Sequence, residues 1–202
     1  MDRYVVLACG LNIRDQNRIT LEEQRLALGT IAKELELIRV VGDKGSYLVA
    51  SRHPAGQVGS LVLSALLARR ADLKIAGAAV ASPTVVVNAL ADLARTLLAR
   101  YGNGFTLRDH GIKLGEDTWG AGLALPLFPS EVPPDRAIFH KIKNAIVFGW
   151  TFGCVLVAKR EAKNVHWGES VTGPASSQMR LHDRVIVELT SRSANILRDL
   201  AG

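Results

Sequence analysis

In the first half of the chain, short apolar runs alternate with stretches whose apolar residues recur at helical spacing. The run at 3–9 is largely apolar and rich in β-formers, and it predicts a buried strand. After a polar loop the period changes, since apolar residues between 21 and 35 fall on one helical face. Thr20 and Glu23 have the spacing of a capping box, which opens a helix. The sequence therefore predicts a strand followed by a helix through residue 35.

The pattern up to residue 101 completes a familiar supersecondary arrangement. It predicts strands at 37–41, 46–51 and 73–80, and helices at 58–70 and 82–100, with Gly102 as the stop. Gly42 and Gly45 lie between the first two of these strands and suit a hairpin, because glycine tolerates positive φ. The order strand, helix, strand, strand, helix, strand is that of the ferredoxin-like, or split βαβ, pattern.

The second half of the chain carries weaker signals. It predicts buried strands at 145–148, 154–158 and 185–189, a proline-rich loop at 128–135, and a terminal helix from Ser191 to Leu200. We therefore expect an α+β fold with a ferredoxin-like N-terminal lobe at 1–101 and a smaller, mixed α+β C-terminal lobe at 102–202. The two lobes can share one hydrophobic core.

Composition narrows the classes of function. The chain has 202 residues, of which 48% are hydrophobic and 22% charged, as is usual for globular proteins and unlike disordered chains. Its net charge of +6 is spread over both halves, so no block resembles a nucleic-acid-binding arm. Arginine outnumbers lysine by 17 to 8; this suits phosphate contacts, but a GC-rich genome explains it more simply.

Several absences in the sequence favour a cytoplasmic protein that needs no membrane, metal or cofactor. The longest apolar run, at 145–158, is shorter than the roughly 20 residues of a membrane-spanning helix. Cys9 and Cys154 lie in apolar runs without C-x-x-C spacing, and we expect them to be small buried hydrophobes in a reducing compartment. The histidines show no spacing typical of metal ligands.

The two ends of the chain resemble those of a bacterial protein family. Residues 4–13 read Tyr-Val-Val-Leu-Ala-Cys-Gly-Leu-Asn-Ile, and residues 189–200 read Leu-Thr-Ser-Arg-Ser-Ala-Asn-Ile-Leu-Arg-Asp-Leu. Both resemble the family called domain of unknown function 1697. That family opens with a strand, Arg-Gly-Ile-Asn-Val-Gly-Gly and an Asn, and closes with Thr-Thr-Arg-Asn-Trp-Asn and a short helix. Asn17 and Leu21 match the Asn and the apolar start of the first helix.

The resemblance covers the first lobe and returns at the C-terminus. Residues 44–49 are similar to the family's strand pair around Ser-Gly-Asn-Val. Cys9 stands where the family has arginine, Arg14 and Asp15 where it has two glycines, and Ala194 where it has tryptophan. The resemblance implies a ferredoxin-like lobe and a soluble bacterial protein, and it brings no established activity.

The loop between the first strand and the first helix holds the main candidate site for a ligand. Asn12, Arg14, Asn17 and Arg18 bring hydrogen-bond donors next to a helix N-terminus, where free N–H groups favour anions. The loop has no G-x-G-x-x-G and no Walker lysine, and its asparagines can instead cap the loop's own turns. We predict that Asn12, Arg14 and Arg18 face an anion-sized concavity.

Arg192 and Asn195 are the remaining ligand candidates. With a helix that begins at Ser191, Arg192 places a fixed positive charge in the first turn, which is unfavourable with the helix dipole. We therefore expect Arg192 to have a carboxylate partner or a bound anion outside the helix. The simpler version is a salt bridge to the N-terminal lobe that holds the two lobes together.

Phe148, Trp150 and Phe152 alternate, which predicts three rings on one strand face. Such a face can be the buried side of a core strand or a platform that stacks RNA bases. We expect it to be mainly buried, since aromatic residues at strand spacing usually are. The basic residues that would support the nucleic-acid alternative are Lys141, Lys143 and Lys159.

No strong catalytic motif is present. Asp109 with His110 and Glu116 with Asp117 are acid–base candidates, although spacing alone does not bring them together. The function that the sequence favours is a binding module for an anionic small ligand or nucleic acid. The alternative is an enzyme of unknown reaction with a site between the two lobes.

Overall fold

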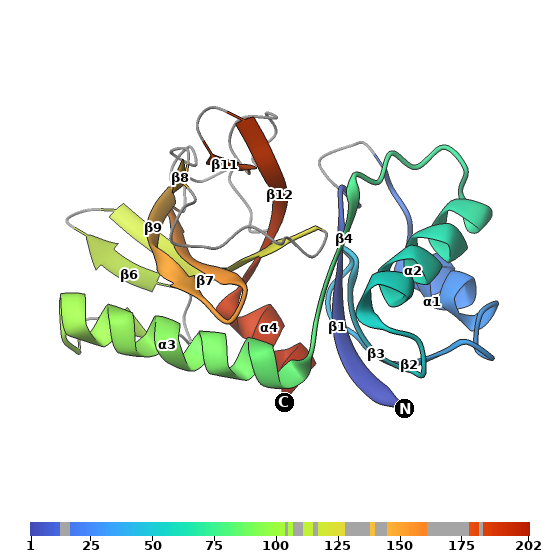
Figure 1. Cartoon of the computed structure of the whole chain (residues 1–202), viewed down its shortest axis with the longest axis horizontal. Coiled ribbons are helices and arrows are strands. Elements are labelled where there is room, and N and C mark those ends of the chain that lie inside the picture. The colour runs from blue at the N-terminus through green and yellow to red at the C-terminus, as the bar shows by residue number, and fades with distance from the viewer. Residues whose placement is uncertain are drawn as a thin grey trace.

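The computed structural model describes residues 1–12, 17–103, 105–106, 111–114, 117–127, 138–139, 145–160, 178–181 and 184–202. The N-terminal lobe contains β1 (Asp2–Cys9), α1 (Leu21–Gly29), β2 (Leu35–Val40), β3 (Ser46–Ser51), α2 (Ala55–Arg69) and β4 (Gly77–Ala81). Its strands form an antiparallel sheet in the order β2-β3-β1-β4, with α1 and α2 on one face (Figure 1). The predicted order of strand, helix, strand, strand, helix and strand is confirmed.

The capping box opens α1 as predicted. The Thr20 hydroxyl accepts the Glu23 N–H at 3.1 Å, and the Glu23 carboxylate accepts the Thr20 N–H at 2.8 Å. The helix is shorter than expected, however, because it ends at Gly29 and the fully buried Leu35 begins β2. The helical spacing of apolar residues does not show where a helix ends. The prediction therefore wrongly included the turn after Gly29 and the start of β2 in the helix. β4 likewise starts later than the predicted strand at 73–80.

The second lobe is built on a larger antiparallel sheet. It follows the long helix α3 (Pro83–Tyr101). Its elements are β5 (Phe105–Thr106), β6 (Gly111–Leu114), β7 (Asp117–Pro126), β8 (Ile138–Phe139), β9 (Ala145–Thr151), β10 (Cys154–Arg160), β11 (Gln178–Leu181), β12 (Arg184–Ser193) and α4 (Ala194–Ala201). The strands follow the order β5-β6-β7-β12-β11-β8, and β10 pairs with both β7 and β9. The α+β architecture in two lobes is as predicted.

The long helix α3 connects the two lobes. Ser82 caps its first turn and Gly102, with φ 63°, ends it, both as predicted. The helix runs along the second lobe and packs against β7, β9, β10 and α4 (Figure 1). Among the described residues, no helix combines the length and apolar character needed to cross a bilayer.

One hydrophobic core joins the lobes. Successive residues of β1 point to opposite faces of the first sheet. Val6 is buried in the cluster formed with α1 and α2. Val5 and Leu7 are buried in a second cluster, together with Leu93 of α3 and Leu123 of β7. The first sheet is thus covered on both faces, which explains why its central strand is continuously apolar.

The boundary between the last strand and the last helix lies further along the sequence than predicted. β12 continues to Ser193, and this residue, rather than Ser191, is the N-cap of α4. Ser193 has extended backbone angles (φ −64°, ψ 153°) and makes no side-chain capping bond. Arg192 therefore lies in a strand and not in the first turn of a helix, so the helix-dipole argument for it was wrong.

Candidate functional site

The asparagines of the first loop hold the loop itself in shape. The Asn12 amide donates to the carbonyls of Ile19 at 2.8 Å and Asp43 at 2.6 Å, and its oxygen accepts the Ile19 N–H at 2.8 Å. The Asn17 amide donates to Gly10 at 2.9 Å and its oxygen accepts the Lys74 N–H at 2.8 Å. Both residues have left-handed backbone angles, with φ 50° and 55°. Their polar atoms are thus engaged in the turn-capping that the sequence offered as the alternative.

A hollow does lie beside the start of α1, and Asn12 and Arg18 both line it. Its volume is about 550 Å³. Arg70 brings a second guanidinium, but Glu23 and Asp43 line the same hollow. Arg70 is also paired already, since its Nε donates to the Asp72 carboxylate at 2.8 Å. The hollow therefore has mixed charge. Arg14 lies outside the described residues.

Arg192 is a buried contact between the two lobes. Only 2% of its surface is exposed. Its Nε donates to the Ser46 hydroxyl at 2.9 Å, and its Nη2 donates to the carbonyls of Ala8 at 2.8 Å and Lys44 at 2.7 Å. Its Nη1 donates to the Thr190 hydroxyl at 3.0 Å and to the Ser191 carbonyl at 2.9 Å. Each of the guanidinium's five N–H groups has an acceptor.

The partners of Arg192 differ from those expected. No carboxylate accepts from the guanidinium in these contacts; the acceptors are hydroxyls and carbonyls of both lobes. Burial lowers the pKa of Arg192 from its usual value, as expected for a cation removed from water. The expected salt bridge is therefore replaced by hydrogen bonds from the charged guanidinium to neutral acceptors, although the predicted link between the lobes is present. Asn195 lies on α4, where it accepts from Arg198 at 3.3 Å.

The hairpin turn at 42–45 lies close enough to β1 to contact Arg192 because its last residue, Gly45, has no side chain. Gly45 has φ 73°, and a Cβ at this position would lie 2.9 Å from the Ala8 Cβ. The close approach lets Gly45 accept the Ala8 N–H at 2.8 Å, next to the Ala8 and Lys44 carbonyls that Arg192 contacts.

The predicted aromatic face is broken by a bulge and a turn. Phe148 is buried, at 9% exposure, but Phe152 is 52% exposed. The register of β9 against β10 shifts at Leu156 and Val157, opposite Phe148. Phe152 lies beyond the end of β9, in the turn, and so does not share a strand face with Phe148. The expectation of one mainly buried face was therefore wrong at Phe152.

The residues named for nucleic-acid binding lie wholly or partly outside the described parts of the structure. Trp150 is in β9 opposite Val155, and Lys159 is in β10, but their side chains are outside the described parts. Lys141 and Lys143 lie outside the described residues altogether. The acid–base candidates Asp109, His110 and Glu116 are also outside, while Asp117 begins β7. Among the residues that are described, no three His, Cys, Asp or Glu side chains gather to hold a metal ion.

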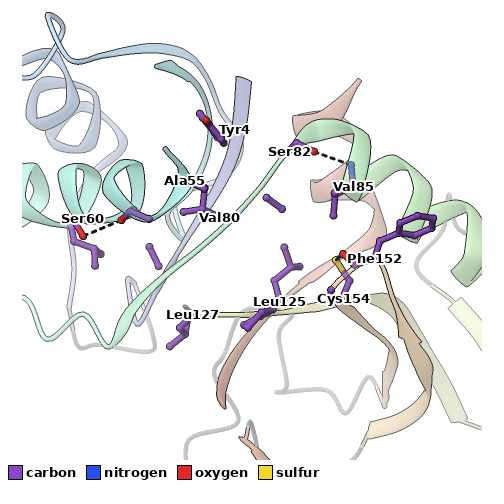
Figure 2. Close-up of a pocket in the computed structure, with 17 residues that line it drawn as sticks. Tyr4, Ala55, Ser60, Val80, Ser82, Val85, Leu125, Leu127, Phe152 and Cys154 are labelled. Carbon is purple, nitrogen blue, oxygen red and sulfur yellow. Dashed lines mark hydrogen bonds between the residues drawn. The ribbon is translucent and has the colours of Figure 1, made fainter. Parts of the chain in front are cut away.

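An apolar pocket that the sequence did not reveal lies between the lobes (Figure 2). Its volume is about 450 Å³. α2 and β4 of the first lobe form one wall, through residues such as Gly59 and Val80. Val85 of α3, Leu125 of β7 and Cys154 of β10 belong to the other wall. The lining residues come from distant parts of the chain, and only the meeting of the two lobes brings them together.

The described lining of this pocket carries no charged side chain, and its polar side chains are largely engaged. The Tyr4 hydroxyl donates to the carbonyl of His53 at 3.1 Å. The Ser60 hydroxyl donates to a carbonyl one turn earlier in α2 at 3.2 Å, and the Ser82 hydroxyl accepts from the helix that it caps. Burial raises the pKa of the Cys154 thiol to about 12, so its nucleophilic thiolate is scarce at neutral pH.

The tight turn between β9 and β10 borders the pocket and is strained. Phe152 and Gly153 have φ 47° and 74°, the left-handed angles of a two-residue hairpin. A bulky residue rarely adopts such angles. The Thr151 hydroxyl donates to the Asp92 carboxylate at 2.5 Å, which ties the turn to α3. Figure 2 shows the Phe152 ring beside α3 rather than at the centre of the pocket.

Comparisons with known proteins identify the fold and no function. No family model matches the chain, and no curated protein matches it. The structure is similar to that of a conserved bacterial protein from Streptococcus pneumoniae, with a TM-score of 0.50 and 15% sequence identity. The similarity covers 98% of this chain and 96% of that one. The two proteins share an α+β fold through both lobes.

Proposed function

We propose that this chain is a binding protein that holds a small, uncharged and largely apolar ligand in the pocket between its lobes. The observation that carries the proposal is an apolar pocket of about 450 Å³ with no charged side chain among its described lining residues. Small-molecule sites commonly have this size and this apolar character, and they often lie where two structural units meet.

The anionic ligand that the sequence favoured has weaker support. Arg18 and Arg70 line the hollow beside α1, but the carboxylates of Glu23 and Asp43 would oppose an anion there. Arg192 has hydrogen-bond acceptors for all its N–H groups and is not among the residues of that hollow. An inorganic phosphate titration tests this second candidate. A rise in melting temperature that is lost in Arg18→Ala would favour it.

An enzyme with a site between the lobes also has less support than a binding protein. The described pocket lining contains Ser60, Ser82 and Cys154, which are potential nucleophiles, but no His, Asp, Glu or Lys that could act as a general base. Membership of the domain of unknown function 1697 family remains a separate proposal, supported by the motif residues at the two ends of the chain.

A pocket-filling substitution tests the proposed function. Gly56 lines the pocket, and a Cβ added there meets no atom within 4 Å. Gly56→Leu should therefore fold and occupy ligand space. Gly29 is the matched control, because it is also helical, also has open space around its Cβ, and does not line the pocket.

The probe is N-phenyl-1-naphthylamine, an uncharged dye whose fluorescence rises in apolar surroundings. We expect saturable binding to the wild type and to Gly29→Leu. Gly56→Leu should bind at least about tenfold more weakly, which corresponds to about 1.4 kcal/mol. Equal affinity in all three proteins, or no saturable binding to the wild type, would contradict the proposed function.

A further inference from the structure

The pocket lies along an unpaired edge of the first sheet. β4 is the last strand in the order β2-β3-β1-β4, and within the described residues it pairs with β1 and with no other strand. β4 is nevertheless largely covered, with Ala78 only 4% exposed. An edge without a strand partner leaves its outward N–H and C=O groups to find hydrogen bonds elsewhere, because main-chain groups inside a protein are almost always paired.

The direction of the unpaired groups follows from the register. Ala8 donates its N–H to Gly45, on the β3 side of β1. Neighbouring residues of a strand point their main-chain groups to opposite sides, so Leu7 and Cys9 turn toward β4. The Cys9 carbonyl indeed accepts the Ala76 N–H at 3.1 Å. Leu7 is paired with Ala79, and Cys9 with Gly77.

It follows that Ala78 and Val80 turn their N–H and C=O groups away from β1. Both residues line the pocket between the lobes. Opposite them, α2 approaches closely because it has a glycine there, and a Cβ on Gly59 would lie 3.1 Å from a methyl group of Val80. The lining of the pocket is therefore apolar. Along one of its sides, however, the N–H and C=O groups of Ala78 and Val80 supply main-chain hydrogen-bond donors and acceptors.

We propose that the ligand of this pocket is a short extended peptide segment that pairs with Ala78 and Val80 as an added strand beside β4. The inference rests on the proposed function and names its ligand class. Strand addition supplies main-chain hydrogen bonds, while the pocket receives alternate side chains. Three residues at about 3.3 Å each span about 10 Å, enough to pair with both outward-facing residues.

The lining also limits the composition of the peptide. No charged side chain is available in the described lining to compensate a carboxylate or an ammonium group. The peptide should therefore have apolar or small side chains and should present an internal segment rather than a charged terminus. Acetyl-Val-Ala-Val-amide, which has blocked ends, is the probe for this ligand class.

A backbone methylation series tests the proposal without changing the protein. Each amide nitrogen of the probe is methylated in turn, and binding is measured by calorimetry and by displacement of N-phenyl-1-naphthylamine. An added strand points every second N–H group toward β4. Methylation of the Ala nitrogen and methylation of the two Val nitrogens should therefore differ in how much they reduce the affinity. One class should weaken binding at least tenfold, and the other should change it less than threefold.

A pair of protein variants tests the same contact from the other side. Val80→Pro removes the outward N–H, which an edge strand tolerates because that group is not part of the ladder with β1. Val80→Ala shortens the side chain and keeps the N–H. We expect Val80→Pro to lose peptide affinity at least tenfold relative to Val80→Ala.

The outcomes separate this inference from the proposed function. Dye binding that the peptide fails to displace, with no heat of peptide binding, overturns the peptide inference and leaves the proposed function standing. Equal losses at every methylated position also overturn it, because apolar burial alone would then explain the affinity. Absence of both dye and peptide binding overturns both proposals.

Discussion

Replacing Arg192 with methionine should destabilise the whole protein by separating its two lobes. The substitution keeps an apolar stem of similar length and removes the guanidinium that donates to Ser46, Ala8 and Lys44 of the first lobe. It leaves five acceptors without this donor, two of them the hydroxyls of Ser46 and Thr190. Buried acceptors that lose their donor are more costly than the mean hydrogen bond suggests.

The expected magnitude follows from two opposing effects. Five hydrogen bonds from a charged donor, at about 1.5 kcal/mol each, contribute about 7.5 kcal/mol of stability. Removing the buried charge relieves a desolvation cost of several kcal/mol, which offsets about 4.5 kcal/mol of this loss. We therefore expect the free energy of unfolding to fall by about 3 kcal/mol, or the melting temperature by about 6–12 °C for a chain of this size.

Urea denaturation followed by circular dichroism, together with calorimetry, measures this loss. Arg25→Met is the control, since Arg25 is exposed on α1 and should change the free energy of unfolding by no more than about 0.5 kcal/mol. A loss below about 1 kcal/mol in Arg192→Met would show that Arg192 does not hold the lobes together, because its five buried hydrogen bonds would then stabilise the contact no more than one does.

Three further predictions concern the turn, the surface charges and the buried thiol. Phe152→Asn should raise the free energy of unfolding by about 1 kcal/mol, because asparagine tolerates the left-handed backbone angle. Urea denaturation measures this change, and an unchanged or lower free energy of unfolding would mean that the turn is not strained. The Arg70 guanidinium lowers the pKa of Asp72 to about 2, so stability from this pair is present above about pH 4 and is lost as the pH falls toward 2. Acid titration of Arg70→Gln should show a smaller loss of stability in that range, and an unchanged profile would contradict the assignment. Burial raises the pKa of Cys154 to about 12, so iodoacetamide at pH 8 should modify it about a thousandfold more slowly in the native than in the unfolded protein, as followed by mass spectrometry. Comparable rates would mean that the thiol is accessible and ionised.

Local signals in the sequence predicted the first lobe well. The capping box at Thr20 and Glu23 and the glycines at 42 and 45 act within a few residues, so their physical consequences can be read from the sequence. Periodicity gave the element order but misplaced boundaries, as at Leu35, where one apolar spacing fits both a helix and the start of a strand.

The pocket could not be predicted in the same way. Its lining joins Tyr4, Gly59, Val80 and Leu125, which no local pattern connects. The partners of Arg192 were equally inaccessible, because Ala8 and Lys44 are far from it in sequence and offer only main-chain carbonyls. One signal for the tight turn was present in the sequence at Phe152 and Gly153. An aromatic residue followed by glycine between two apolar strands is as compatible with a two-residue turn as with an aromatic strand face.

Chemical-shift mapping tests most directly whether the pocket between the lobes is the binding site. Amide spectra of the labelled protein are recorded while N-phenyl-1-naphthylamine is added. With the ligand in this pocket, we expect the largest changes at Gly59, Val80, Leu125 and Cys154, from both of its walls. Changes centred on Asn12, Arg18 and Glu23 beside α1, or scattered without a maximum at the pocket, would contradict this expectation.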